Sequence, residues 1–427
     1  MTGLAKNFET LGRMTFPRLA GLVATLALAA CASGNPSSPS GKTVATQPPA
    51  AQVPAGSGGQ DAVKVGLLLP LSGPGANVGS EMLNAAQIAL FDLGGDRFNL
   101  LPRDTKGSPA EAAEATRKLV ADGAKLILGP LFATEVDAAA PVARSAAVNL
   151  LAFSNDWQRA GNGTYILGFV PADQVARIVG YARTRGLTRI AALAPRNPYG
   201  DAVIAALHDS AQRQGVSVVR EERYTADNAD LAAAVARIGA APSAAPAPAA
   251  AAGAAAGAPV ATTTGGAFDA LLIADGGDRL KAIAPLLAAN RIDPARVRLL
   301  GTGLWDDPGI VRLPGIAGAW FAAPAPQARA DFEGRFEGLY HHRPARLATL
   351  AYDATALAAV LARLPSRNSF DSVNLTNPSG FAGVDGIFRL RGDGLVERGL
   401  AVIEIGPQGP RVIDQAPTSF EAVSSAR

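Results

Sequence analysis

Cysteine and histidine are scarce in this chain. Its 427 residues include a single cysteine, Cys31, and only three histidines. One cysteine excludes a disulfide within the chain and excludes metal sites built from cysteine pairs. His341 and His342 are adjacent and point in different directions on a helix, while His208 lies in a separate helical context. We therefore predict no metal site.

The common catalytic and phosphate-binding motifs are also missing. The sequence contains no GxSxG and no HExxH. The stretch "SGPGANVGSE" has glycines spaced GxGxxxG, one residue longer than the dinucleotide fingerprint, and no Gly-Lys-Ser/Thr follows it. We expect a non-enzymatic protein without a cofactor. An enzyme is the third alternative, because a Ser-His-Asp triad can be assembled from residues that are distant in sequence.

Charge is low as well. Charged residues make up 18% of the chain, the formal net charge is +3, and no basic run is interleaved with aromatic residues. A nucleic-acid-binding surface needs such a basic patch, so we expect no nucleic-acid partner. Hydrophobic residues, by contrast, reach 48% of the chain, enough for a large core divided between two lobes.

The N-terminus has the order of a secretory signal. Residues 1–30 contain basic residues, then the apolar run "LAGLVATLALAA" and small residues before Cys31. Twelve residues span about 18 Å as a helix, less than the hydrocarbon core of a bilayer, so we do not expect a permanent membrane helix. The four residues "LAAC" resemble a bacterial lipobox, which implies cleavage before Cys31 and acylation of its thiol. The alternative is a signal peptide that contains a cysteine by chance.

Two segments have compositions that do not favour a packed core. Residues 31–62 are rich in Pro, Ser, Gly and Ala, which predicts a flexible tether after the lipidated Cys31. Residues 240–266 are an Ala, Pro and Gly tract, which predicts a disordered surface insertion. No Asp follows Cys31, since Ala32 and Ser33 come next, and this favours an outer-membrane anchor.

The remaining chain alternates short apolar runs with helical patterns. "VKVGLLL" predicts a buried strand and "EMLNAAQIALFDL" a helix, and the strand-helix unit recurs. Strands without polar alternation indicate parallel sheets covered on both faces, hence an α/β fold with two Rossmann-like lobes. We expect a first lobe at 63–170 with part of 325–378. The second lobe is expected at 171–324 with 379–410, and a C-terminal tail at 411–427.

Loops after the predicted strands are the candidate ligand site. In parallel α/β sheets, ligands bind beyond the carboxyl ends of the strands, so loops from both lobes are expected to meet at a cleft. The candidate cleft residues are Leu71, Ser72, Phe132, Ala133, Thr134, Ser154, Asn155, Asp156, Tyr199, Asp275 and Trp305. The alternative for some polar positions is helix capping, for which Thr134 and Asp278 are good examples.

The order of motifs resembles a known family. "VKVGLLLPLSGPGANVG", "ADGAKLILGPLFATEVDAAAPVA", "RNPYGDAVIAAL" and "LAYDATAL" followed by "FAGVDGIFRL" are similar to the leucine-binding branch of type 1 periplasmic binding proteins. The resemblance covers nearly all of 63–405. It implies two Rossmann-like lobes joined by three crossovers, with a hinge that closes on ligand.

Several positions depart from the amino-acid binders of that family. Where those proteins usually supply a serine for the ligand carboxylate, this chain has Ala133, followed by Thr134. Asp156 stands where a hydroxyl residue is expected, and it would repel a ligand carboxylate unless it is paired or faces the ligand's ammonium. Tyr199 of "PYG" matches the aromatic residue of the second lobe.

Other stretches resemble a second branch of the same fold. "LLAFSNDWQRAGNGTYILGFV", "GTGLWDDPGIVRLPGIAGAWFAAPAP" and the lipobox are similar to the penicillin-binding protein activator lipoproteins. Our leading hypothesis is thus a lipid-anchored, periplasm-facing envelope protein whose partner is a peptidoglycan synthase. The alternative is a receptor for branched-chain-type amino-acid uptake, in which a small amino-acid-like ligand closes the lobes and an ABC permease binds the closed form.

Overall fold

The computed structural model describes residues 62–225, 227–240, 268–364 and 368–420, which belong to one unit of the chain. The predicted signal peptide, Cys31, the tether up to residue 61 and almost all of the predicted insertion lie outside the described residues. Among the described helices, none is long and apolar enough to cross a membrane.

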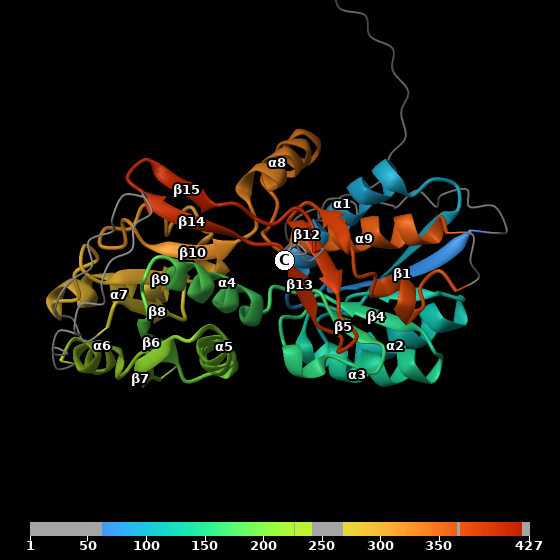
Figure 1. Ribbon diagram of the computed structural model, residues 1–427. Helices are drawn as coiled ribbons and strands as arrows, with labels where there is room; N and C mark the ends of the chain where they lie inside the picture. Colours follow the sequence, from blue (N-terminus) through green and yellow to red (C-terminus); the bar gives the residue numbers. More distant parts are fainter. Residues whose placement is uncertain (1–61, 226, 241–267, 365–367, 421–427) are drawn as a thin grey trace, which may run out of the picture. The chain divides into compact units, whose positions relative to one another are not determined.

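The first lobe is built on a five-stranded parallel sheet. Its order is β2-β1-β3-β4-β5, with the strands β1 Val63–Leu69, β2 Phe98–Asp104, β3 Leu126–Leu128, β4 Asn149–Ala152 and β5 Thr164–Ile166. Helices α1 and α9 pack on one face, and α2 and α3 on the other (Figure 1). Their bounds are α1 Ala76–Leu93, α2 Pro109–Ala121, α3 Ala133–Ser145 and α9 Ala348–Ala362.

The second lobe is built on a seven-stranded sheet, in the order β15-β14-β10-β9-β8-β6-β7. These strands are β6 Arg189–Pro195, β7 Ser217–Tyr224, β8 Ala270–Ile273, β9 Arg298–Gly301, β10 Trp320–Ala323, β14 Ala401–Gly406 and β15 Gly409–Asp414. The pair β14 and β15 runs antiparallel and completes an otherwise parallel sheet. The helices are α4 Pro171–Thr184, α5 Pro198–Gln214, α6 Leu231–Gly239 and α7 Gly277–Ala289.

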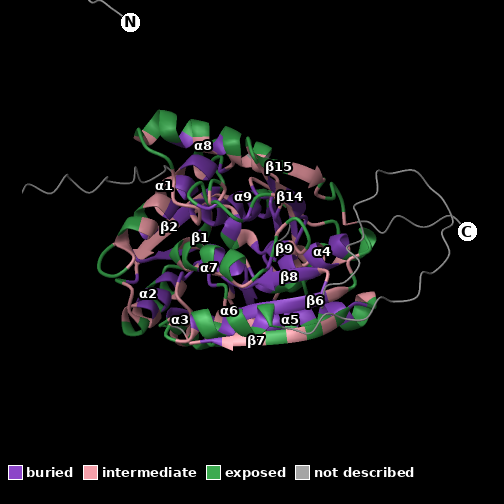
Figure 2. Cartoon of the chain, turned by 90° about the vertical axis from the view of Figure 1, so that its left-hand side faces the viewer, coloured by how far each residue is buried: buried purple, intermediate pink, exposed green. Residues whose placement is uncertain are grey.

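The apolar runs that define these strands are buried between the helices. One apolar cluster lies with α6 and α7 and another with α4 and α5, so each face of the second sheet has its own core. In Figure 2, strands β6, β8 and β9 are buried, whereas the outer face of α8 (Pro326–Tyr340) is exposed. This arrangement confirms the predicted α/β fold with two covered sheets.

A third, antiparallel sheet changes the expected domain boundaries. It contains β11 Phe381–Gly383, β12 Gly386–Leu390 and β13 Val396–Arg398, and its side chains Phe388 and Val396 belong to the core of the first lobe. The assignment of 379–410 to the second lobe is therefore wrong for this sheet, whereas β14 and the start of β15 do join the second lobe. The predicted tail at 411–427 likewise begins within strand β15, and α10 (Ser372–Leu375) completes the described helices.

Two expected helix caps lie inside their helices instead. Helix α3 begins at Ala133, and the backbone N–H of Phe132 donates to Glu135 Oε2 at 3.1 Å, so Thr134 is the second helical residue. Helix α7 begins at Gly277, which places Asp278 in the first turn, where its carboxylate pairs with Lys281 at 2.8 Å. A negative charge in the first turn is still favourable, because it faces the positive end of the helix dipole.

Buried charges connect the chain segments that pass between the lobes. The chain crosses after β5, after β10 and after β13. Arg398, at the end of β13, donates from Nη2 to the Leu167 carbonyl oxygen at 2.6 Å, and its backbone N–H donates to Asp173 at 3.0 Å. The first and third crossovers are thus hydrogen-bonded to each other. Because a buried guanidinium is costly without partners, these contacts fix the two segments together.

Beside this crossover, Asp353 and Asp385 form a close acidic pair, both almost fully buried. Asp385 accepts two hydrogen bonds from Arg346, at 2.9 and 3.2 Å. Among the described residues, Asp353 accepts from backbone N–H groups, one of them that of Val384 at 2.7 Å. Burial and the nearby negative charge of Asp385 raise the pKa of Asp353 to about 7.

We predict that Gly79→Ala destabilises the protein. Gly79 lies within α1, and a methyl group there would sit 2.0 Å from the carbonyl oxygen of Pro70. Because the clash is with backbone, the loop must shift, and we expect a loss of about 1–3 kcal/mol in the free energy of unfolding. Denaturant unfolding measures this change. Gly338→Ala is the control: this α8 glycine has open space, so the substitution should stabilise by up to about 1 kcal/mol. Equal effects of the two substitutions would contradict the close approach.

We also predict a pH-dependent effect of Asp353→Asn. Between the pKa of an unfolded Asp and about 7, the folded protein retains a proton that the unfolded chain releases. The stability that this proton contributes is present at low pH and is lost as the pH rises to about 7. The asparagine side chain of the variant cannot ionise. The variant should therefore gain stability relative to the parent across this window, by roughly 1.4 kcal/mol for each pH unit that separates the folded and unfolded pKa values.

The measurement is denaturant unfolding of both proteins from about pH 4 to pH 8. Asp331→Asn, on the exposed surface of α8, removes one negative charge without altering a buried group and serves as the control. A constant stability difference between Asp353→Asn and the parent at every pH would contradict the prediction.

Candidate functional site

A cavity of about 510 Å³ lies where loops from both sheets meet. Its lining comes from the carboxyl ends of β1, β3 and β4 in the first lobe and of β6, β9 and β10 in the second. The residues are Gly75, Val78, Leu131, Phe132, Phe153, Ser154, Asn155, Phe169, Gln174, Tyr199, Gly303, Leu304, Asp306, Ala323, Pro324, Arg346 and Leu347. This is the edge at which parallel α/β sheets bind ligands, and the volume suits a small organic molecule.

Four aromatic side chains from four separate segments line the cavity. Phe132 follows β3, Phe153 follows β4, Phe169 lies in the first crossover, and Tyr199 is in the first turn of α5. The Tyr199 hydroxyl forms a 2.8 Å hydrogen bond with Thr302 Oγ1. Burial raises the pKa of Tyr199, so its hydroxyl is neutral in any ordinary buffer.

Three uncharged polar side chains accompany these rings. Ser154 accepts the backbone N–H of Asp156 at 3.1 Å through Oγ, and its hydroxyl hydrogen remains to donate. Gln174 accepts the backbone N–H of Gly303 at 2.7 Å through Oε1, which leaves its Nε2 group to donate. Asn155 offers an exposed amide. The cavity therefore provides donors and acceptors without formal charge.

Asp306 and Arg346 are the charged residues among those that line the cavity. Asp306 pairs with Arg329 of α8 through both carboxylate oxygens, and its Oδ2 lies 3.6 Å from Arg346 Nε. Arg346 in turn forms the two-point pair with Asp385. Its guanidinium also lies over the Phe169 ring, 4.4 Å from the ring centre. Each charge on the cavity wall is thus matched by a protein charge.

The structure brings four of the sequence-predicted residues to this cavity: Phe132, Ser154, Asn155 and Tyr199. Ala133 and Asp156 line an adjoining hollow of about 450 Å³, which shares Asn155 and Tyr199 with the cavity. Asp156 pairs there with Arg159 at 2.5 Å. Thr134 is exposed in the first turn of α3 and lines neither space.

The other predicted residues have structural contacts outside the cavity lining. The backbone N–H groups of Leu71 and Ser72 both donate to Asp104 Oδ1, at 2.9 and 3.2 Å. Trp305 is fully buried in the second lobe, where its Nε1 donates to the carbonyl oxygen of Asp275 at 2.8 Å. The Asp275 carboxylate accepts from the hydroxyl of Tyr224 at 2.5 Å.

Several residues of the cavity were missed, among them Phe169, Gln174, Asp306, Arg346 and Leu347. Asp306 directly follows the candidate Trp305 in the loop after β9. Phe169 lies in the first crossover, and Arg346 and Leu347 lie in the loop between α8 and α9, so none of them directly follows a strand. The resemblance to a fold with three crossovers was the available pointer to these segments.

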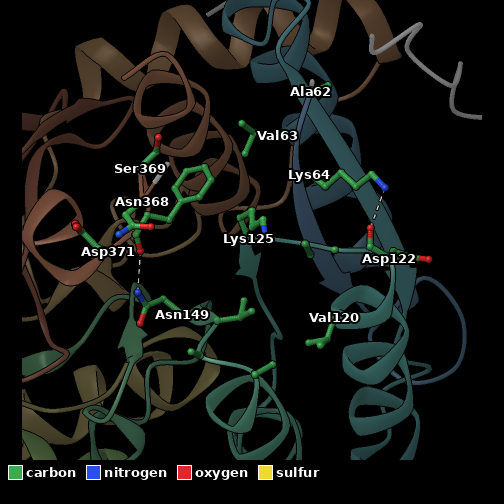
Figure 3. Close-up of a pocket in the computed structure, with 16 residues that line it drawn as sticks. Ala62, Val63, Lys64, Val120, Asp122, Lys125, Asn149, Asn368, Ser369 and Asp371 are labelled. Carbon is green, nitrogen blue, oxygen red and sulfur yellow. Dashed lines mark hydrogen bonds between the residues drawn. The ribbon is translucent and has the colours of Figure 1, made fainter. Parts of the chain in front are cut away.

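A larger hollow of about 690 Å³ lies at the opposite edge of the first sheet. Its lining includes the amino ends of three strands, since Val63 begins β1, Lys125 directly precedes β3 and Asn149 begins β4 (Figure 3). Lys64 also lines it, and its ammonium donates to the Asp122 carbonyl oxygen at 2.9 Å. Ligands of parallel sheets bind at the other edge, so we do not assign this hollow as the site. Among the described residues, no group of His, Cys, Asp and Glu could hold a metal ion.

Comparisons with known proteins agree with this geometry. The Leu/Ile/Val/Thr-binding protein of Salmonella typhimurium is 24% identical over 196 residues, which are 42% of this chain and 52% of that protein. The chain thus spans about half the length of the curated relatives it matches.

Two solved structures have the same fold. A putative branched-chain amino acid ABC transporter protein from Rhodospirillum rubrum superposes with a TM-score of 0.67 at 20% identity, covering 82% of this chain and all of the other. A solute-binding protein from R. palustris, in complex with benzoate, gives 0.58 at 18% identity, covering 84% and 97% of the two chains.

The profile of the family described as "Periplasmic binding protein" matches residues 62–410, which is most of the chain. These residues include every segment that lines the cavity. The chain therefore belongs to the periplasmic binding protein family, and it has the two-lobed type 1 fold.

Proposed function

We propose that the protein is the solute-binding receptor of an ABC transporter. A small organic solute binds in the cavity between the two sheets, and the ligand-bound form is what a permease recognises. The observation that carries this proposal is the cavity itself, because its lining comes from the carboxyl ends of strands in both lobes. A ligand that contacts both lobes favours the conformation in which they are close.

The same observations favour this function over activation of a peptidoglycan synthase. The relatives described above are named as amino-acid-binding proteins or ABC transporter proteins, and none of those is named as a synthase activator. A protein whose cleft had lost its function would not need a cavity lined by neutral hydrogen-bonding groups and aromatic rings. We therefore place the solute receptor first and the synthase activator second.

A non-enzymatic role is part of the proposal. The relatives are solute-binding proteins, and such proteins release their ligand unchanged. The charged residues of the cavity are engaged in ion pairs with other protein groups. No charged side chain of the lining is thereby available as a general acid or base.

Membership of the periplasmic binding protein family implies a location in the cell envelope. We further propose that the protein is anchored there by acylation of Cys31, in the context "LAAC". Two or more acyl chains would hold the protein on the membrane stably, since each buried methylene contributes about 0.8 kcal/mol.

The function is tested by ligand binding to the purified protein. We expect a screen of amino acids and other small solutes to find one that raises the melting temperature saturably. Tyr199→Ala and Phe132→Ala should each weaken its binding about tenfold or more, because each removes a ring from the cavity wall. Isothermal titration calorimetry measures the change.

Phe91→Ala is the matched control, because Phe91 is 94% exposed on α1 and is not among the cavity residues. The variant should bind like the parent. If no solute stabilises the protein, and a peptidoglycan synthase co-purifies with it and is stimulated by it, the receptor function is wrong and the activator function is favoured.

The anchor is tested separately. We expect Cys31→Ala to move the protein from the membrane fraction to the soluble fraction of the envelope, because the variant lacks the thiol that is acylated. Immunoblots of membrane and soluble fractions after a high-salt wash show the distribution, with Cys31→Ser as a second variant. Retention of both variants on the membrane would contradict lipid anchoring at this residue.

A further inference from the structure

We infer that the cavity selects an uncharged solute with an aromatic ring, and that it discriminates against zwitterionic amino acids. This inference rests on the proposed receptor function and specifies its ligand. It follows from three features of the cavity: the pairing of its charged residues, the distribution of its aromatic rings, and the neutrality of its remaining polar groups.

A ligand carboxylate finds no available cation in the lining. Arg346 is the basic residue among those that line the cavity, and it already binds Asp385 through two nitrogens and Thr349 through one, at 2.9 to 3.2 Å. Its Nε faces Asp306. A carboxylate could pair with Arg346 only by displacing Asp385. That would leave Asp385, which is fully buried, without its two hydrogen bonds from Arg346 and with the Thr349 hydroxyl as its remaining side-chain donor among the described residues.

A ligand ammonium is equally disfavoured. Asp306 is the acidic residue of the lining, and both of its oxygens pair with Arg329, whose side chain is only 12% exposed. An ammonium near Asp306 would also approach the guanidinium groups of Arg329 and Arg346. Asp156, the acid that the family comparison placed near the ligand, lies in the adjoining hollow and pairs with Arg159.

The aromatic residues indicate what the ligand presents instead. Phe132, Phe153, Phe169 and Tyr199 come from different segments, so a bound molecule meets rings from both lobes and from the crossover. The Phe169 ring also packs against Arg346 and Arg398, with distances of 4.4 and 4.9 Å from guanidinium carbon to ring centre. These contacts hold the ring in place, and ring-to-ring packing favours an aromatic ligand over an aliphatic one of equal area.

The uncharged polar groups of the lining indicate which polar group the ligand carries beside its ring. Ser154 has a hydroxyl hydrogen to donate, Gln174 has an amide N–H group to donate, and Asn155 can both donate and accept. Such a set satisfies a hydroxyl, carbonyl or carboxamide without requiring a counter-charge. A charged group would lose its hydration in the cavity and gain no opposite charge in return.

Calorimetric titration of the full folded protein tests the inference with five ring compounds and leucine. The probes are benzamide and benzyl alcohol, which are neutral, benzoate and benzylamine, which carry one charge, and phenylalanine and leucine, which are zwitterions. We expect a neutral probe to bind saturably and every charged probe to bind about tenfold more weakly or not at all.

Variants locate the cause of the selectivity. Asp306→Asn removes one of the carboxylates that neutralise Arg329 and Arg346, so benzoate should gain about tenfold in affinity relative to benzamide. Asp156→Asn removes an acid from the adjoining hollow and should leave the preference unchanged. The melting temperature of each variant shows that it is folded, and the probe series on the parent protein does not depend on any variant.

Tighter binding of leucine, phenylalanine or benzoate than of both neutral probes would overturn the inference and leave the receptor function intact. Failure of all six probes to bind would also overturn it, whereas the receptor function fails only if the broader solute screen is negative as well. An unchanged preference in a folded Asp306→Asn variant would show that charge pairing does not set the selectivity.

Discussion

The pairing of buried charge between the lobes is the interaction on which the rest of this structure depends. Asp306 belongs to the second lobe, whereas Arg346 is held by Asp385 in the third sheet, which packs with the first lobe. Removal of charges from water is costly, so these groups are stable in place only as a matched set. The same set closes one wall of the cavity. The contacts that join the lobes therefore also decide which charges a ligand encounters.

Much of the fold could be predicted from apolar periodicity. The run "VKVGLLL" forms β1 at Val63–Leu69, and the run "EMLNAAQIALFDL" lies within helix α1. The hairpin of β12 and β13, with Asp393 and Gly394 in its turn, follows an equally plain pattern. Periodicity does not show whether a hairpin packs into the core of the first lobe or into that of the second. Phe388 and Val396 alternate correctly for a strand that is half buried, but nothing local in the sequence distinguishes packing against the first lobe from packing against the second. That choice depends on long-range contacts.

The sequence predicts which loops line the site better than it predicts which side chains of those loops face the cavity. The loop after β9 supplied the candidate Trp305, and its neighbours Gly303, Leu304 and Asp306 line the cavity. Trp305 turns the other way because Gly301 has no side chain: a Cβ there would lie 2.2 Å from the Trp305 ring. Because Gly301 leaves this space, the Trp305 ring packs into the core. The neighbouring Asp306 remains on the cavity wall. The composition of the loop does not reveal which of these two neighbours faces the cavity.

The position of Asp306 has a consequence for movement between the lobes. Arg329 lies on α8, whose Phe332 and Phe336 pack against α1, so both arginines that meet Asp306 are fixed to the first lobe. Any motion that separates the two sheets must either break these ion pairs or rearrange them. When the lobes separate, water hydrates the separated charges. This hydration offsets part of the free energy that is lost with the ion pairs. A neutral ligand leaves these ion pairs unchanged, so its apolar contacts with both lobes shift the equilibrium directly. A charged ligand would have to compete with the ion pairs that join the two lobes.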